Sequence, residues 1–168
     1  MTESHILVTA SVLEEAEGIK RELAAAKQKK IGGRSVVDGN IGSVPVRLME
    51  TGPGLVNTAQ SLTAAVETRQ PAMVLMTGCA GGFEMAGVKV GDVCIATEEN
   101  DAHLGIEGDG ENRAPEPLPF DLMVGDGVSI KHRIPLDRRM SNSALDILRT
   151  GFDDPAISVH QGPFVTVS

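Results

Sequence analysis

The stretch "TGCAGGFEMAGVKVGDVCIATEE", residues 77–99, decides how this chain folds. It starts where the apolar run 72–76 ends and contains a second apolar run at 90–97, "VGDVCIAT". Nearly continuous apolar runs are typical of central strands that are covered on both faces. The small residues between the two runs predict a tight turn at the carboxyl end of the first strand. Few side chains in this stretch are typical catalysts, so the chemistry must depend on other segments.

Upstream of this stretch, strands alternate with helices. Residues 5–10 read as a short strand, and a helical apolar period predicts a helix over 13–27. Residues 34–52 contain two strand-like stretches, split by "DGN" (38–40) and "GS" (42–43). Asp38-Gly39 predicts a tight hairpin turn, which makes this unit antiparallel. A second helix is expected from 55 to the residues before Pro71. This pattern predicts an α/β fold with a mixed sheet and helices packed on it.

The C-terminal part is less regular. Residues 100–128 are rich in Gly, Pro, Asp and Glu, which predicts an irregular acidic surface loop. A helix over 137–151 and a strand over 156–168 follow. The last strand stops at Ser168, and a chain rarely ends inside an apolar strand. We therefore expect residues 1–168 to form a single, incomplete domain that is truncated at the C-terminus.

Composition limits the classes of partner. The formal net charge is −8, and the chain has no Trp and no Tyr, which disfavours nucleic acid as a partner. No apolar stretch is long enough to span a membrane, and no leader pattern is present, so we expect a cytoplasmic protein without a membrane partner. Cys79 and Cys94 lack metal-type spacing and predict reduced thiols, with Cys94 in the core. The sequence thus favours a small-molecule ligand and gives no basis for a metal site or a cofactor.

Three predicted strand ends carry small residues: 9–11, 51–54 and 77–82. In an open α/β sheet, ligands bind outside the carboxyl ends of the strands. Glycine there lets backbone amides approach a ligand closely, and the helix start after Gly54 offers free N–H groups. Neither the Lys-Ser/Thr ending of a triphosphate loop nor a dinucleotide fingerprint is present. We expect the three corners to converge on one small-molecule site.

Three motifs in order carry a family resemblance: "ILVTASVLEEAEGI" (6–19), "METGPGLVNTAQSL" (49–62) and "VLMTGCAGGFEMAGVKVGDVCIATEE" (74–99). Together they resemble the nucleoside phosphorylase and nucleosidase superfamily, whose members cleave the N-glycosidic bond of purine nucleosides. The resemblance implies a three-layer αβα fold around a central twisted mixed sheet, a purine nucleoside as ligand, and a homo-oligomer, dimer or larger. The segment "ATEENDAHLGIE" (96–107) is similar to futalosine hydrolases of menaquinone biosynthesis, which release hypoxanthine from futalosine and leave dehypoxanthine futalosine. His103 in this segment stands where those proteins more often carry an acid, and it is a candidate for substrate contact or a solvent-exposed loop residue.

The resemblance also implies site residues. It places the general base that positions the attacking water at Glu14, with Glu15 as the neighbour that could replace it. By composition alone, both are solvated acids in the first turn of a helix. It places Cys79, Ala80 and Gly81 at the pocket floor, and Gly54 is expected to present amides to substrate. Met76 stands near the place where phosphorolytic relatives carry an arginine, which favours water as the second substrate.

Some functional parts of the family do not occur in the sequence. The family continues with a Met-Glu pair that binds ribose and with an aspartate that hydrogen-bonds the purine, so we expect residues 1–168 alone to have little or no activity. The main hypothesis is a hydrolase of purine nucleosides, most similar to futalosine hydrolase. The alternatives are a purine nucleoside phosphorylase, a methylthioadenosine/S-adenosylhomocysteine nucleosidase, or a noncatalytic nucleoside-binding remnant.

Overall fold

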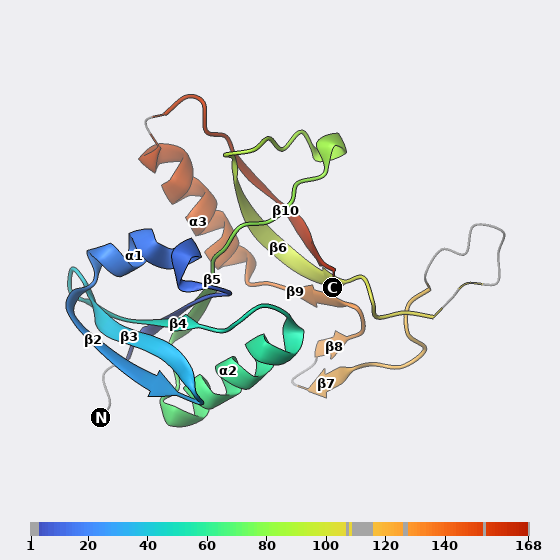
Figure 1. The fold of residues 1–168 in the computed structure, drawn as a ribbon. Coiled ribbons are helices and arrows are strands. Elements are labelled where there is room, and N and C mark those ends of the chain that lie inside the picture. Colours follow the sequence, from blue (N-terminus) through green and yellow to red (C-terminus); the bar gives the residue numbers. More distant parts are fainter. Residues whose placement is uncertain (1–3, 107, 109–115, 126–127, 153, 168) are drawn as a thin grey trace. The chain divides into compact units, whose positions relative to one another are not determined.

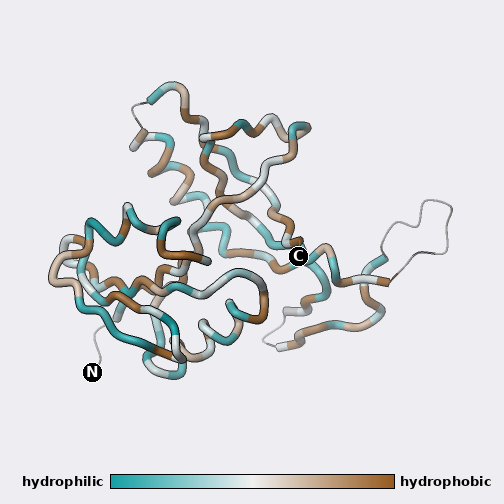
Figure 2. Tube along the Cα trace, in the orientation of Figure 1, coloured by the Kyte–Doolittle hydropathy of each residue, from teal (hydrophilic) through white to brown (hydrophobic). Residues whose placement is uncertain are grey.

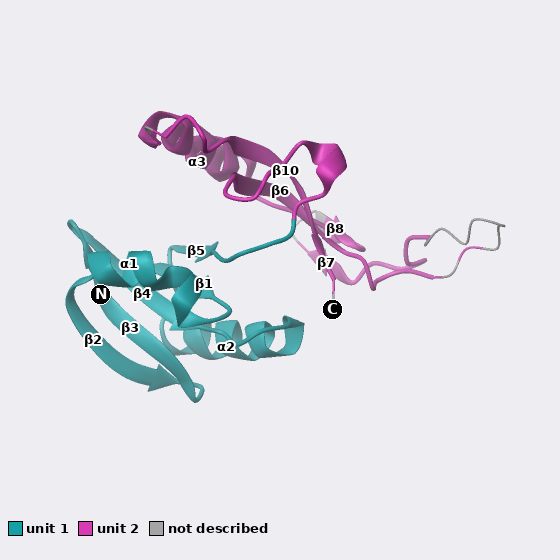
Figure 3. Cartoon of the chain, turned by 45° about the horizontal axis from the view of Figure 1, so that its top comes forward, with its two compact units in different colours: residues 1–81 teal, residues 82–168 magenta. Residues whose placement is uncertain are grey.

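The computed structural model describes residues 4–106, 108, 116–125, 128–152 and 154–167. The chain forms two compact units, residues 1–81 and residues 82–168 (Figure 3). Among the described residues, no helix combines the length and the apolar character needed to cross a membrane.

Unit 1 is built on a mixed sheet of five strands (Figure 1). The strand order is β2-β3-β4-β1-β5, with β1 spanning Ile6–Ala10, β2 Ala24–Ile31, β3 Arg34–Ile41, β4 Val44–Glu50 and β5 Met73–Met76. Strand β1 pairs in parallel with β4 and with β5, whereas β2, β3 and β4 pair antiparallel. The mixed sheet predicted from the sequence is therefore confirmed.

Alternating side chains of the sheet build two apolar clusters on its opposite faces, because neighbouring residues of a strand point to opposite sides. Leu48 packs in one cluster with Ala16 of the 3₁₀ helix η1 (Leu13–Ala16), and helix α1 (Glu17–Glu22) follows on this face. Met49 packs in the other cluster with Ala65 of helix α2 (Leu55–Thr68). Unit 1 thus has the expected layers, with a helix on each face of the sheet.

The helix predicted over residues 13–27 is wrong in its second half. Helix α1 ends at Glu22, and Ala24–Ile31 forms the edge strand β2 against β3. Alanine and lysine favour a helix, but pairing with β3 outweighs that local preference. Figure 2 shows most of β2 as hydrophilic, which fits an edge strand that charged side chains protect from further pairing.

The hairpin turn predicted at Asp38-Gly39 is also wrong. Strand β3 runs through both residues, and the turn to β4 lies at Gly42, whose φ of +58° is left-handed. Gly39 has another role, because a Cβ there would lie 2.9 Å from the carbonyl oxygen of Ala24. The glycine permits close approach of β2.

The apolar run at 73–76 was predicted to be a central strand, but β5 is the edge of the unit 1 sheet. Its side chains are partly exposed, Val74 at 44% and Leu75 at 45%. An apolar run alone does not distinguish a central strand from an edge strand.

Unit 2 contains a three-stranded sheet in the order β10-β6-β9. Strand β6 (Val93–Asp101) pairs in parallel with β10 (Val159–Thr166) and antiparallel with β9 (Arg133–Pro135). Helix α3 (Arg138–Gly151) lies against β6, and Ser141 Oγ donates a hydrogen bond of 2.9 Å to the Ala96 carbonyl oxygen. Unit 2 also contains the short 3₁₀ helix η2 (Glu84–Ala86).

The helix predicted over 137–151 and the strand predicted over 156–168 are confirmed in position by α3 and β10. The predicted loop over 100–128 contains strand β7 (Met123–Gly125), which pairs with β8 (Val128–Ile130). Part of that loop, 107, 109–115 and 126–127, lies outside the described residues. The expectation that Cys94 is a core residue is wrong, because its side chain is exposed.

Candidate active site

The three small-residue corners meet at the carboxyl end of the sheet in unit 1. The Thr51 N–H donates to the Ala10 carbonyl at 2.9 Å, and the Gly52 N–H donates to the Ser11 carbonyl at 3.0 Å. On the other side of β1, the Thr77 N–H donates to the Thr9 carbonyl at 2.9 Å. The ladders of β4 and β5 therefore continue past the strand ends, and the expected convergence of segments 9–11, 51–54 and 77–82 is found.

Buried hydroxyl groups fix the second of these corners. Thr51 Oγ1 bonds the Ala10 carbonyl at 3.2 Å, and Ser61 Oγ of α2 donates to the Thr51 carbonyl at 3.0 Å. Both side chains are almost completely buried. Because a buried hydroxyl needs a partner, these bonds hold the turn and the start of α2 in one geometry.

Glu15 reaches the third corner. The N–H of Cys79 donates to Glu15 Oε1 at 3.1 Å. Gly78 makes this approach possible, because a Cβ there would lie 3.1 Å from Glu15 Oε2. Oε2 itself is buried and has no hydrogen-bond partner among the residues that the structure describes. One carboxylate oxygen is thus anchored by the backbone, while the hydrogen-bonding capacity of the other is unused.

Glu14, which the sequence resemblance made the general base, is exposed. The two glutamates are consecutive in η1, and consecutive residues of a 3₁₀ helix point about 120° apart. Only one of them can face the Cys79 turn, and the structure brings Glu15 there. The alignment of a short motif cannot fix this one-residue choice, which depends on where the first helical turn begins.

Gly54 is the N-cap of α2, with φ at +87°. This left-handed conformation favours glycine, and the Gly54 carbonyl accepts the first helical hydrogen bond, from the Thr58 N–H at 3.1 Å. The N–H groups of the first helical turn lack partners within the helix and carry partial positive charge. They can therefore bind an oxygen atom of a ligand at this edge.

Sequence reasoning missed Arg34 beside this turn. A Cβ at Gly52 would lie 3.0 Å from Arg34 Nη1, and the guanidinium also donates to Asn57 of α2. Arg34 therefore brings a positive charge next to the 51–54 corner. Arg34 follows the turn between β2 and β3. Its place near the 51–54 corner could not be predicted, because the sequence predicts a helix where β2 lies.

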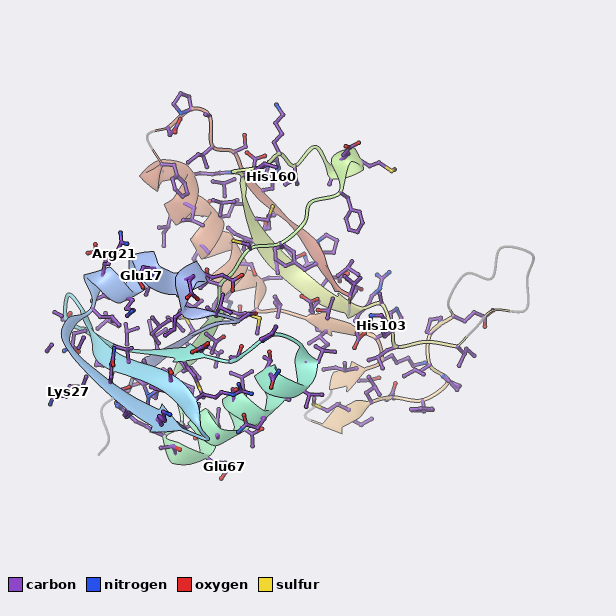
Figure 4. The ribbon with its side chains drawn as sticks, in the orientation of Figure 1. Glu17, Arg21, Lys27, Glu67, His103 and His160 are labelled. Carbon is purple, nitrogen blue, oxygen red and sulfur yellow. The ribbon has the colours of Figure 1, made fainter. Side chains whose placement is uncertain are left out.

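The remaining candidates are exposed. Cys79, Ala80 and Gly81 follow β5 as an exposed segment, and the Cys79 thiol is free. His103, labelled in Figure 4, belongs to unit 2, and its backbone N–H donates to Asp101 Oδ1 at 2.9 Å. Among the described residues, no group of three or more His, Cys, Asp and Glu side chains gathers as metal ligands.

This geometry supports acid–base chemistry. A carboxylate that is held at one oxygen can orient a water molecule with the other and accept its proton. The glycine corners leave room for a ligand against backbone N–H groups. Such an arrangement suits the attack of water on a small molecule bound at the carboxyl ends of β1, β4 and β5.

Two proteins with similar sequences are named as the same enzyme. A 5'-methylthioadenosine/S-adenosylhomocysteine nucleosidase of Exiguobacterium sp. is 26% identical over 159 residues, which cover 95% of this chain and 62% of the relative. The same enzyme of Bacillus cytotoxicus is 38% identical over 93 residues, which cover 55% of this chain and 40% of the relative. These names match an alternative of the sequence analysis and not its futalosine hypothesis.

Solved structures of similar proteins show the fold. The 5'-methylthioadenosine/S-adenosylhomocysteine nucleosidase of Neisseria meningitidis, in complex with methylthio-immucillin-A, has a TM-score of 0.78 at 24% identity and covers 98% of this chain. The enzyme of Streptococcus pneumoniae with a transition-state inhibitor has a TM-score of 0.76 at 22% identity and covers 97% of this chain. The chain covers 64% of each of these structures. The predicted nucleoside phosphorylase-like α/β fold is confirmed.

The profile of the phosphorylase superfamily matches residues 4–168, which is nearly the whole chain and includes all three small-residue corners. The chain therefore belongs to the phosphorylase superfamily.

Proposed function

We propose that the protein is a nucleosidase that hydrolyses the N-glycosidic bond of a purine nucleoside, with 5'-methylthioadenosine and S-adenosylhomocysteine as its substrates. The observation that carries this proposal is the Glu15 carboxylate, held by the Cys79 N–H with its second oxygen unpartnered. The names of the relatives support the choice of substrates.

In the proposed reaction, Glu15 acts as the general base. It takes a proton from water while the water oxygen bonds to C1' of the ribose and the bond from C1' to the purine nitrogen breaks. The base leaves with the bonding electron pair and gains a proton. A ribosyl cation-like transition state forms on this path, as in glycoside hydrolysis, and the Glu15 negative charge stabilises it.

The glycine corners bind the nucleoside in this proposal. Cys79, Ala80 and Gly81 line the pocket floor, and the free N–H groups after Gly54 bind an oxygen of the substrate. The resemblance places the acid that protonates the leaving base, and part of the ribose site, after residue 168. Assays therefore use the whole gene product, whatever its length, and we expect residues 1–168 alone to show little activity.

Futalosine remains the competing substrate. Its support is the similarity of segment 96–107 to futalosine hydrolases, and position 107 lies outside the described residues. The proposed use of water, rather than phosphate, rests on Met76, an apolar residue at the end of β5.

One experiment separates these possibilities. The protein is incubated with methylthioadenosine, S-adenosylhomocysteine, futalosine and inosine, with and without phosphate, and the free base is measured by chromatography. We expect adenine from the first two substrates at a rate independent of phosphate. Hypoxanthine from futalosine alone would favour futalosine hydrolysis, and ribose 1-phosphate formed only with phosphate would identify a phosphorylase. Saturable nucleoside binding without turnover would indicate a noncatalytic binding protein.

A further inference from the structure

Unit 1 has a polar cavity at the end of the sheet opposite to Glu15. Its volume is about 250 Å³, and its polar lining consists of His5, Lys27, Asp38, Asn40, Arg47 and Arg69. His5 directly precedes β1, whereas the candidate active site lies where β1 ends. The two sites are therefore separated by the full length of this strand.

The cavity lies next to the C-terminal end of helix α2, since the C-cap residue Arg69 is part of its lining. Leu7 and Met49 on this face pack against α2. His5 lies two residues before Leu7, and Arg47 lies two residues before Met49. Since side chains alternate along a strand, His5 and Arg47 lie on the same face as these two residues. The helix ends at Thr68, so the polar end of the face continues beyond its last turn, next to the C-cap residue Arg69.

An irregularity in β2 shapes the cavity wall. The register of β2 shifts between Ala24 and Lys27, and Ala25 in this bulge has a left-handed φ of +52°. A non-glycine residue in this conformation is strained. The bulge places Lys27 opposite Asp38 in the ladder. Bulges commonly redirect side chains next to functional sites.

The charged side chains that line the cavity are mainly basic, although the protein as a whole is acidic. Three basic side chains line it, Lys27, Arg47 and Arg69, against one acid, while the whole chain has a net charge of −8. That acid, Asp38, is already engaged, since it accepts bonds from Arg47 Nε at 2.8 Å and from Lys29. Burial raises the pKa of Asp38, but the bonds from Arg47 and Lys29 outweigh burial and hold this pKa below its usual value.

Two buried side chains of the lining have hydrogen-bonding atoms without a partner in the described part of the chain. Arg47 is 3% exposed, and its Nη1 has none. His5 is 2% exposed, and neither ring nitrogen has one. Buried polar atoms are nearly always satisfied, and an unsatisfied charged donor is the costliest case. An oxyanion in the cavity would supply the missing acceptors.

We propose that this cavity binds a small phosphate group, either as inorganic phosphate or as the end of a phosphomonoester. A phosphate group has several oxygens on one phosphorus atom, so it can accept hydrogen bonds from donors on different strands, such as Lys27 and Arg47. Arginine is also well adapted to bind phosphate. The volume lies below the range typical of drug-sized ligands, which favours a small group over a whole cofactor.

Bound phosphate would change His5 measurably. Burial, followed by the charges of Arg69 and Arg47, lowers the pKa of His5 below 6.5. A negative charge in the cavity offsets the two arginines and favours the imidazolium, so phosphate raises this pKa. Asp38 and Lys29 also act on His5, and phosphate leaves both in place.

The test is a titration of the ¹⁵N-labelled protein with inorganic phosphate, followed by NMR, with sodium chloride at equal ionic strength as reference. We expect saturable shifts of the amides at 38–40 and 46–47 and a higher His5 pKa. A parallel titration with ribose 5-phosphate distinguishes the sources, because tighter binding than inorganic phosphate identifies an ester.

The site variant is Lys27→Gln with Arg69→Gln, and the matched control is Arg21→Gln with Lys30→Gln. Both control residues are exposed and outside the cavity lining. We expect the site variant to weaken phosphate binding about tenfold or more, the effect of one lost charged hydrogen bond, and the control to bind as the parent does. If the double variant does not fold, Lys27→Gln alone is tested, because Lys27 is exposed. We expect this single variant also to weaken phosphate binding.

Three outcomes would overturn the proposal. They are no saturable shift at 38–40 and 46–47, shifts confined to the active-site segments 51–57 and 77–81, and equal weakening by the control variant. Each is independent of nucleosidase activity, so the proposed function stands or fails separately.

Discussion

At the scale of single residues, the position of the Glu15 carboxylate depends on the absence of a side chain at Gly78. A Cβ at position 78 would lie 3.1 to 3.3 Å from the Glu15 carboxylate group. The carboxylate must move when this space is filled, and small displacements of a catalytic group have large effects on rate.

We therefore expect Gly78→Ala to lower the kcat for release of adenine from methylthioadenosine by about tenfold to a hundredfold, while the protein remains folded. Gly151→Ala at the end of α3 is the matched control, because a Cβ there meets nothing within 4 Å and the residue lies outside the proposed site. Steady-state kinetics and circular dichroism of both variants check this. Equal losses in the two variants would show that the effect of Gly78→Ala is unrelated to Glu15.

A second prediction at this scale concerns His5 and pH. Its folded-state pKa lies below the value of 6.5 expected for the unfolded chain. Below pH 6.5 the unfolded chain therefore binds a proton that the folded chain does not, and this lowers stability as pH falls towards the folded-state pKa. We expect His5→Gln to reduce the loss of unfolding free energy between pH 7.5 and pH 5.5, measured in urea without phosphate. An unchanged pH dependence would exclude His5 as its source.

At the scale of elements, the β2–β3 pairing depends on Gly39, where a Cβ would lie 2.9 Å from the Ala24 carbonyl oxygen. We expect Gly39→Ala to lower the free energy of unfolding by about 1 to 3 kcal/mol, the usual cost of overpacking, in urea unfolding curves. Gly18→Ala in α1 meets nothing within 4 Å and should be neutral or stabilising. A neutral Gly39→Ala would mean that β2 moves freely away from β3.

The elements also show how far sequence reasoning extends. Helices α2 and α3 and the glycine corners could be predicted, because local signals such as helical period, a proline stop and small residues determine them. Strand β2 could not, because its residues favour a helix and only pairing with β3 makes them a strand. The choice of Glu15 over Glu14 and the cavity at His5 depend on angles and packing that no local pattern contains.

At the scale of the whole molecule, family membership and site geometry support one account. The superfamily profile spans both compact units. Glu15, the converging segments 9–11, 51–54 and 77–81, and the cavity for which we propose phosphate binding all belong to unit 1. The chain spans 62% of the length of its Exiguobacterium relative, and the activity is proposed for the whole gene product, whatever its length.

The central claim is that Glu15, and not Glu14, activates the attacking water. The most direct test measures kcat for methylthioadenosine hydrolysis in Glu15→Gln and in Glu14→Gln. The account predicts a loss of about a hundredfold or more for Glu15→Gln, the usual size of a general-base contribution, and little change for Glu14→Gln. Full activity in Glu15→Gln together with a large loss in Glu14→Gln would contradict it.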